Sequence, residues 1–271
     1  MMKKRIKYIT FADFMFVLLL ILAGSFAGAA SDLLYFGAYA VPIFLIIFLF
    51  REEFASPYDK IKIKKGGGLA AITFGSPTIL AVMGIAALTS EVIEGLGGEV
   101  EKISTVPHFV YSVLLLALAP AIVEELLFRY VPMKLIADRS PRACVLFSAV
   151  MFSASHLSLQ SIPYAFFAGV VFMAVDIIAD SVLPSVILHF LNNFLSVSFA
   201  YFGKEMWFEI GIIVIFSLLL ALSLVLFIVK RKKLISEIRA AFSAGERFSG
   251  FAFAAVFVLC CLFIAASKFM V

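Results

Sequence analysis

The stretch PHFVYSVLLLALAPAIVEELLFRYVPMKLIA, residues 107–137, is long and apolar enough to cross a lipid bilayer, yet three charged side chains lie near its middle. A helix needs about 20 predominantly apolar residues to cross about 30 Å of hydrocarbon. A charged group at that depth is costly, so Glu124, Glu125 and Arg129 together form a functional hypothesis. The stretch therefore predicts a membrane protein with a polar site inside the bilayer.

The composition of the whole chain agrees with this interpretation. Hydrophobic residues make up 63% of the 271 residues and charged residues only 15%, whereas a soluble domain is about half apolar and a quarter charged. The apolar residues fall into segments at about 10–30, 33–50, 68–89, 107–137, 143–160, 162–180, 183–203, 207–229 and 251–270. The sequence predicts one all-α domain over 1–271, a polytopic membrane bundle of eight or nine transmembrane helices, with one shorter segment left open as a partial span.

Positive charge gives the predicted bundle an orientation. Basic residues collect at the N-terminus, in the loop 51–65, after residue 133 and in the loop 230–250, and with alternating spans all four groups fall on one side. The positive-inside rule makes that side the cytosol. We predict a multi-pass cell-membrane protein with a cytoplasmic N-terminus. The first span is expected to stay uncleaved, although residues 27–30 resemble a signal-peptidase site.

The remaining charge and cysteine patterns restrict the possible partners. The net charge of +4 is accounted for by membrane orientation, so a nucleic-acid partner is not expected. The basic segment 231–247 is either an amphipathic helix on the cytosolic leaflet or a connecting loop. Cys144, Cys260 and Cys261 lie in or beside apolar segments without metal-ligand spacing, so they indicate no redox chemistry.

Helical spacing separates the two adjacent glutamates. Glu125 and Arg129 are four residues apart with the acid first, the favourable order for an ion pair on one helix face. Glu124 is rotated by about 100° from Glu125, because a helix has about 3.6 residues per turn. We therefore predict a supporting Glu125–Arg129 pair and a free Glu124 carboxylate that can accept a proton.

Other polar residues lie at depths in the predicted spans that allow them to be close to Glu124. Glu124 lies roughly 20 Å from the cytosolic end of its span at about 1.5 Å per residue, and His156 lies at a similar depth on the next span. His189 and Asn193 share one face of the span 183–203. These four side chains can converge in a cavity, which we predict to open towards the cytoplasm.

Hydrolysis is the chemistry that such a set supports. A carboxylate and a histidine can deprotonate water, while a second histidine and an amide can donate hydrogen bonds to a developing oxyanion. Alternatively Glu124, His156 and His189 hold a divalent metal such as zinc, whose bound water is the nucleophile. The sequence contains no HExxH motif, so a zincin-type site is not supported.

Three motifs carry a family resemblance: EELLFR at 124–129, FSASH at 152–156 and HFLNN at 189–193. They resemble the EExxxR, FxxxH and HxxxN/D motifs of the CAAX protease and bacteriocin-processing (CPBP, Abi) family, which includes the type II CAAX prenyl endopeptidases. The resemblance covers about 107–200, the expected catalytic core. It leaves open whether the protein is an intramembrane metalloprotease or a metal-free glutamate protease.

The resemblance also implies roles for individual residues. It makes Glu124 and His156 the pair that activates water, and His189 and Asn193 the oxyanion donors. In addition, Glu125 and Arg129 would support the site, and Phe152 would form part of the wall of the pocket. Asn192 could exchange roles with Asn193.

The predicted function is that of a membrane endopeptidase. It would cleave a peptide bond near the C-terminus of a lipid-modified or membrane-bound peptide in the bilayer, whether or not the substrate is prenylated. A proton-coupled transporter and a non-catalytic bacteriocin-immunity or scaffold protein are the alternatives. Asp176 and Asp180 are interpreted as a solvated pair at the membrane interface, with a role in substrate entry as the alternative.

Overall fold

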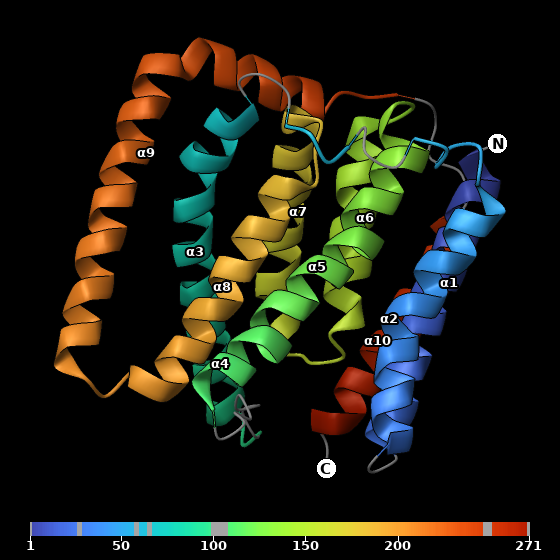
Figure 1. The fold of residues 1–271 in the computed structure, drawn as a ribbon, viewed down its shortest axis with the longest axis horizontal. Coiled ribbons are helices and arrows are strands. Elements are labelled where there is room, and N and C mark those ends of the chain that lie inside the picture. Colours follow the sequence, from blue (N-terminus) through green and yellow to red (C-terminus); the bar gives the residue numbers. More distant parts are fainter. Residues whose placement is uncertain are drawn as a thin grey trace.

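The computed structural model describes residues 2–25, 29–56, 60–63, 67–98, 108–245 and 251–269, and all regular structure in these residues is helical. The helices stand side by side in one bundle (Figure 1). They are α1 Met2–Gly24, α2 Ala29–Leu49, α3 Gly67–Gly95, α4 Phe109–Ser112, α5 Ala119–Glu125, α6 Pro141–Ser155, α7 Ser161–Ala179, α8 Leu183–Phe202, α9 Met206–Ala241 and α10 Phe251–Phe269. The predicted all-α class is confirmed.

Six helical stretches have the length and hydropathy needed to cross a membrane. They are Met2–Gly24, Gly68–Gly95, Phe109–Ala137, Ser161–Ala179, Leu183–Phe202 and Met206–Ala241. Shorter apolar helices cover Gly37–Leu49, Pro141–Ser155 and Ala252–Ser267. The predicted number of eight or nine spans therefore stays a prediction. Helices suit this environment because each satisfies its own backbone hydrogen bonds where water is absent.

The rod from Phe109 to Ala137 contains three π-helical segments, η1 Val113–Leu118, η2 Leu126–Tyr130 and η3 Met133–Ala137. Pro120 and Pro132 lie between them, and a proline inside a helix cannot donate a backbone hydrogen bond and crowds the preceding turn. π-Helical turns often occur at functional sites. Here the α5 segment that carries both glutamates lies between two such widened turns.

Close packing fixes α6 against α7. A Cβ atom added at Gly169 of α7 would lie 2.8 Å from the Cα of Ala149 of α6. A side chain at residue 169 would therefore separate the two backbones, and small residues at such contacts are typical of membrane helices. This contact sets the position of the C-terminal part of α6, which carries Phe152 and leads to His156.

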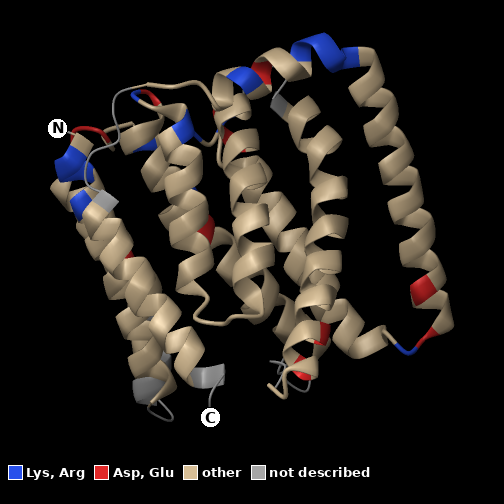
Figure 2. Cartoon of the chain, turned by 180° about the vertical axis from the view of Figure 1, so that it is seen from behind, with Lys and Arg blue, Asp and Glu red and all other residues tan. Residues whose placement is uncertain are grey.

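Charge divides the bundle into two ends. Lys and Arg gather at the end where α1 begins and where α7 and α9 finish, which we call the basic end (Figure 2). The opposite, far end carries the exposed acids Glu91, Glu94, Glu205 and Glu209. The distribution predicted from the sequence is thus present in the fold, while the assignment of the basic end to the cytosol stays a prediction.

The last part of α9 runs across the basic end instead of continuing along the bundle (Figure 1). Its Leu234 is fully buried in a cluster with Ala70 of α3 and Val175 of α7. The lysines at 230, 232 and 233 are exposed on the same part of the helix. Residues 231–241 are helical, residues 246–247 lie outside the described residues, and the amphipathic helix on the cytosolic leaflet stays a prediction.

Candidate active site

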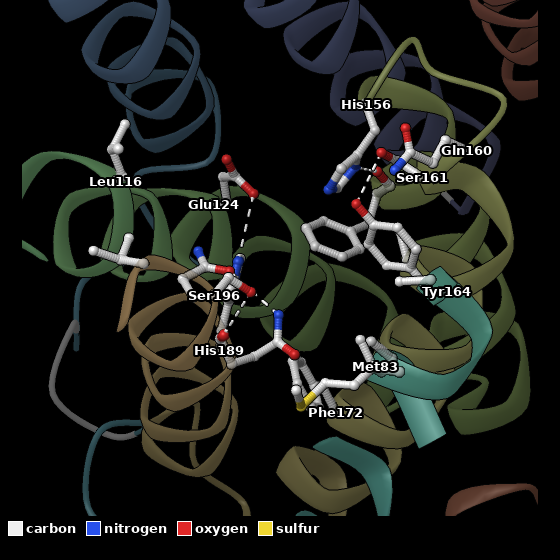
Figure 3. Close-up of a pocket in the computed structure, with 18 of the residues that line it drawn as sticks. Met83, Leu116, Glu124, His156, Gln160, Ser161, Tyr164, Phe172, His189 and Ser196 are labelled. Atoms are coloured by element: carbon white, nitrogen blue, oxygen red, sulfur yellow. Dashed lines mark hydrogen bonds and ion pairs between the residues drawn. The ribbon is translucent and has the colours of Figure 1, made fainter. Parts of the chain in front are cut away.

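A cavity of about 820 Å³ lies among α3, α5, α6, α7 and α8. The predicted residues Glu124, Phe152, His156, His189 and Asn193 all line it, as does Asn192. Figure 3 shows Glu124 and His189 reaching into this space from one side and His156 from another. The convergence predicted from depth and helix order is therefore present, whereas the catalytic roles of these residues stay predictions.

Glu125 and Arg129 form the predicted ion pair beneath the cavity. Arg129 Nε lies 3.2 Å from Glu125 Oε2, and both side chains are fully buried. The guanidinium carbon of Arg129 also lies 4.0 Å from the centre of the Phe152 ring. Such a stacked cation suits arginine, because its planar group is weakly hydrated. The pair thus connects the α5–η2 rod to the wall of the cavity on α6.

His189 lies between the two glutamates, an arrangement that the sequence did not predict. Its Nδ1 is 2.7 Å from Glu125 Oε1, and its Nε2 is 4.0 Å from Glu124 Oε2. Because Glu125 is ion-paired with Arg129, its carboxylate accepts and the Nδ1 of His189 donates. The contact fixes the ring, so that Nε2 faces Glu124 and the cavity.

His156 is oriented by its own helix. It caps the C-terminus of α6, and its Nδ1 lies 2.8 Å from the backbone carbonyl of Phe152. A carbonyl can only accept, so Nδ1 carries the proton and a neutral ring presents the Nε2 lone pair. Leu157 follows with a φ of 51°, which ends the helix. Both histidines therefore use Nδ1 for support and leave Nε2 available.

The two asparagines are related by a contact that distinguishes them. Asn192 Nδ2 donates to Asn193 Oδ1 at 3.4 Å. The carbonyl of Asn193 is thus occupied, and its NH2 group remains available to a ligand in the cavity. This arrangement favours Asn193 as the donor and Asn192 as the residue that orients it.

Asp176 belongs to the buried surroundings of the site, so the interpretation of this residue as solvated at the interface is wrong. It is 0% exposed, and its Oδ1 accepts a hydrogen bond of 3.0 Å from the backbone N–H of Ser185. It interacts electrostatically with Glu125 and Arg129. Its partner in the prediction, Asp180, instead pairs with Lys60 at 2.5 Å. Four-residue spacing could not reveal this difference, because Asp176 is buried within α7 whereas Asp180, at the end of that helix, is only half-buried.

The described residues do not form a metal centre. No group of three or more His, Cys, Asp and Glu side chains among them lies close enough together to hold a metal ion. Glu124, His156 and His189 share the cavity, and the metal ion that they would hold in the alternative interpretation stays a prediction.

The predicted opening of the cavity towards the cytoplasm stays a prediction, as does the orientation of the bundle. Lining residues lie from about the middle of each helix towards the far end, whereas the sequence predicted an opening at the basic end. The predicted depth of Glu124, roughly 20 Å from the basic end of a bilayer about 30 Å thick, already places it nearer to the other side. Side chains between the site and the basic end, which the depth estimate ignored, fill the remaining space.

The comparison with known proteins bears on this same region. Residues 106–195 match the model of the family described as type II CAAX prenyl endopeptidase Rce1-like. No curated protein and no solved structure matches the chain. The matched segment includes the cavity-lining residues from Leu116 to Asn193.

Fold and site together define the class as a multi-pass helical membrane protein with a polar cavity inside the bundle. Within this class, the segment 106–195 carries an Rce1-like domain, and the predicted resemblance to CAAX proteases is confirmed for that segment. Rce1-like domains belong to a family of proteases, which supports a hydrolase.

Proposed function

We propose that this protein is an intramembrane endopeptidase that cleaves a peptide bond near the C-terminus of a membrane-associated protein or peptide. The observation that carries the proposal is the position of the Glu124 carboxylate. It lies in a cavity with two histidines whose Nδ1 atoms are already bonded and whose Nε2 atoms are available. A carboxylate beside imidazole groups is suited to general acid–base catalysis.

Glu124 takes the proton of a water held between it and Nε2 of His156. The water oxygen forms a bond to the carbon of the scissile carbonyl, and the carbonyl oxygen becomes an oxyanion. Collapse of this intermediate breaks the carbon–nitrogen bond. Glu124 then returns its proton to the leaving nitrogen, so that an acid and an amine are released and the carboxylate is restored.

The oxyanion is stabilised by donors on α8. Asn193 offers its NH2 group, because its carbonyl accepts from Asn192. His189 donates from Nε2 when both ring nitrogens carry protons, and the carboxylate of Glu125, which accepts from Nδ1, balances that charge. Preorganised donors of this kind contribute strongly to acyl transfer, since they need no reorientation during the reaction.

Apolar residues form much of the remaining cavity wall. They include Val82 and Met83 of α3, Leu116 of η1 and Phe172 of α7. Such a surface favours aliphatic or lipid-like groups next to the scissile bond, because their burial releases water. Both a prenylated C-terminus and an unmodified apolar segment fit this description.

A cleavage assay on purified protein tests the proposal. The probes are a fluorogenic peptide ending in a prenylated CAAX sequence and the same peptide without the lipid. We expect Glu124→Gln to abolish cleavage of whichever probe the wild type cleaves, because the amide cannot accept the proton of the water. Glu209→Gln is the matched control, since Glu209 is exposed on α9 and does not line the cavity.

A second test does not depend on the choice of probe. It compares the C-terminal sequences of membrane proteins in cells with and without the gene. Full activity of Glu124→Gln would contradict the assignment of the base. Unchanged C-termini together with no cleavage of either peptide would contradict the peptidase as a whole.

A further inference from the structure

The cavity has a consistent position along every helix that lines it. In α3 it is lined by residues 82–86, in a helix that begins at the basic end with residue 67 and finishes at 95. In α8 the lining runs from His189 to Phe199, in a helix that begins at the basic end and finishes at Phe202. In α7, which runs the other way, it starts at Ser161, the first residue. The cavity therefore extends from mid-bundle towards the far end.

The side towards the basic end is filled by buried groups. Directly beyond His189 lie Glu125, Arg129, Asp176 and Ser185, each 0% exposed. Beyond them, the loop before α3 is bonded to the α7–α8 turn. Val182 N donates to Lys60 O at 2.8 Å, and Ser181 Oγ donates to Ile61 O at 2.8 Å. These layers make the basic-end side the floor of the cavity.

Polar groups line the cavity on the opposite side. Gln160 and Ser161 stand at the start of α7, where Tyr164 Oη donates to Ser161 Oγ at 2.8 Å. Gln160 Nε2 donates to Ser90 Oγ of α3 at 2.9 Å. Ser196 contributes a further hydroxyl from α8. Wettable groups at this end suit an entrance, since water and peptide backbone both need hydrogen-bond partners.

The shortness of α6 leaves room for this entrance. α6 has 15 residues, about 22 Å at 1.5 Å per residue, which is less than the bilayer core. The connection from α6 to α7 consequently turns well short of the far ends of the neighbouring α3 and α1 (Figure 1). His156 lies at this turn, and its ring faces the cavity (Figure 3).

We propose that the cavity is entered from the far end of the bundle, opposite the basic residues. Basic residues mark the cytosolic side of membrane proteins, and at the far end of this bundle the exposed Lys204 stands beside the four exposed acids Glu91, Glu94, Glu205 and Glu209. The entrance therefore faces the exterior. In combination with the proposed peptidase activity, on which this step rests, the substrate class is an exported peptide or the outward-facing C-terminal segment of a membrane protein.

Site-directed labelling tests the entrance without relying on catalysis. Cys260 and Cys261 are replaced by Ser and Cys144 by Ala, and single cysteines are then introduced as S196C in the cavity, E205C at the far end and K232C at the basic end. A charged, membrane-impermeant maleimide is applied to right-side-out and inside-out membrane vesicles. We expect S196C and E205C to react in right-side-out vesicles, and K232C to react only in inside-out vesicles.

The controls separate the possible failures. Reaction of S196C only in inside-out vesicles, together with K232C, would overturn the proposal. The proposal would also be overturned if S196C reacts in detergent but in neither vesicle preparation. If E205C itself reacts only in inside-out vesicles, the assigned orientation is wrong and the entrance faces the cytosol.

The same vesicles extend the test to the substrate. The unlipidated probe peptide, which does not cross the bilayer, should be cleaved by right-side-out and not by inside-out vesicles. Cleavage in inside-out vesicles alone would overturn the proposed substrate class. Labelling from the exterior without cleavage in either orientation would overturn the peptidase while the position of the entrance stands.

Discussion

Glu125 of α5 accepts a hydrogen bond of 2.7 Å from Nδ1 of His189 of α8, although 64 residues separate them in the chain. This contact joins two of the three sequence motifs in one buried group. Glu125 also holds Arg129, which lies over Phe152, so the third motif is connected as well. The supporting pair predicted from helix spacing is thereby the centre of the whole site.

Replacement of Glu125 should therefore destabilise the protein more than replacement of Glu124. Glu125→Gln leaves the buried Arg129 without a countercharge, and breaking a buried pair costs about 3–5 kcal/mol. Glu124 is 18% exposed and is not ion-paired with Arg129 among the described contacts. Thermal unfolding of both variants in detergent measures the difference. Equal unfolding temperatures would contradict the structural role of Glu125.

Asp176 should act through its bond to α8. Asp176→Ala leaves the backbone N–H of Ser185 buried without its acceptor, and such a loss costs about 1–3 kcal/mol. Asp176→Asn keeps a carbonyl oxygen at that position and should recover most of the unfolding temperature. An equal loss in the asparagine and alanine variants would show that the charge of the carboxylate, and not the hydrogen bond, is required.

The two asparagines should differ in their effect on turnover. Asn193→Ala removes a proposed oxyanion donor, so we expect kcat to fall by about 100-fold or more, while KM changes little. Asn192→Ala removes only the group that orients Asn193, and its loss should be smaller. Steady-state kinetics on the same peptide compares them. A greater loss for Asn192→Ala would exchange their roles.

Removal of metal ions should leave the rate unchanged, because the proposed mechanism activates water with Glu124 and His156 and assigns no step to a metal. Purified protein is treated with a strong chelator and passed into metal-free buffer, and cleavage of the probe peptide is measured before and after treatment. A loss of activity that added zinc restores would contradict the proposal and support the alternative set of Glu124, His156 and His189.

The sequence alone determined the features that depend on one helix at a time. Apolar length and composition predicted an all-α membrane bundle, because the bilayer admits little else. Spacing within one helix predicted the Glu125–Arg129 pair and distinguished Glu124 from it. The three motifs also carried the family resemblance that the match at 106–195 supports.

Only the tertiary structure decided how these helices face one another. The bond between His189 and Glu125, the burial of Asp176 and the end of the bundle towards which the cavity extends depend on helix rotation, tilt and depth. Periodicity within a helix is set by 3.6 residues per turn and can be read locally. Contacts between helices are set by close packing, such as that of Gly169 on Ala149, and by prolines and π-helical turns that shift the register.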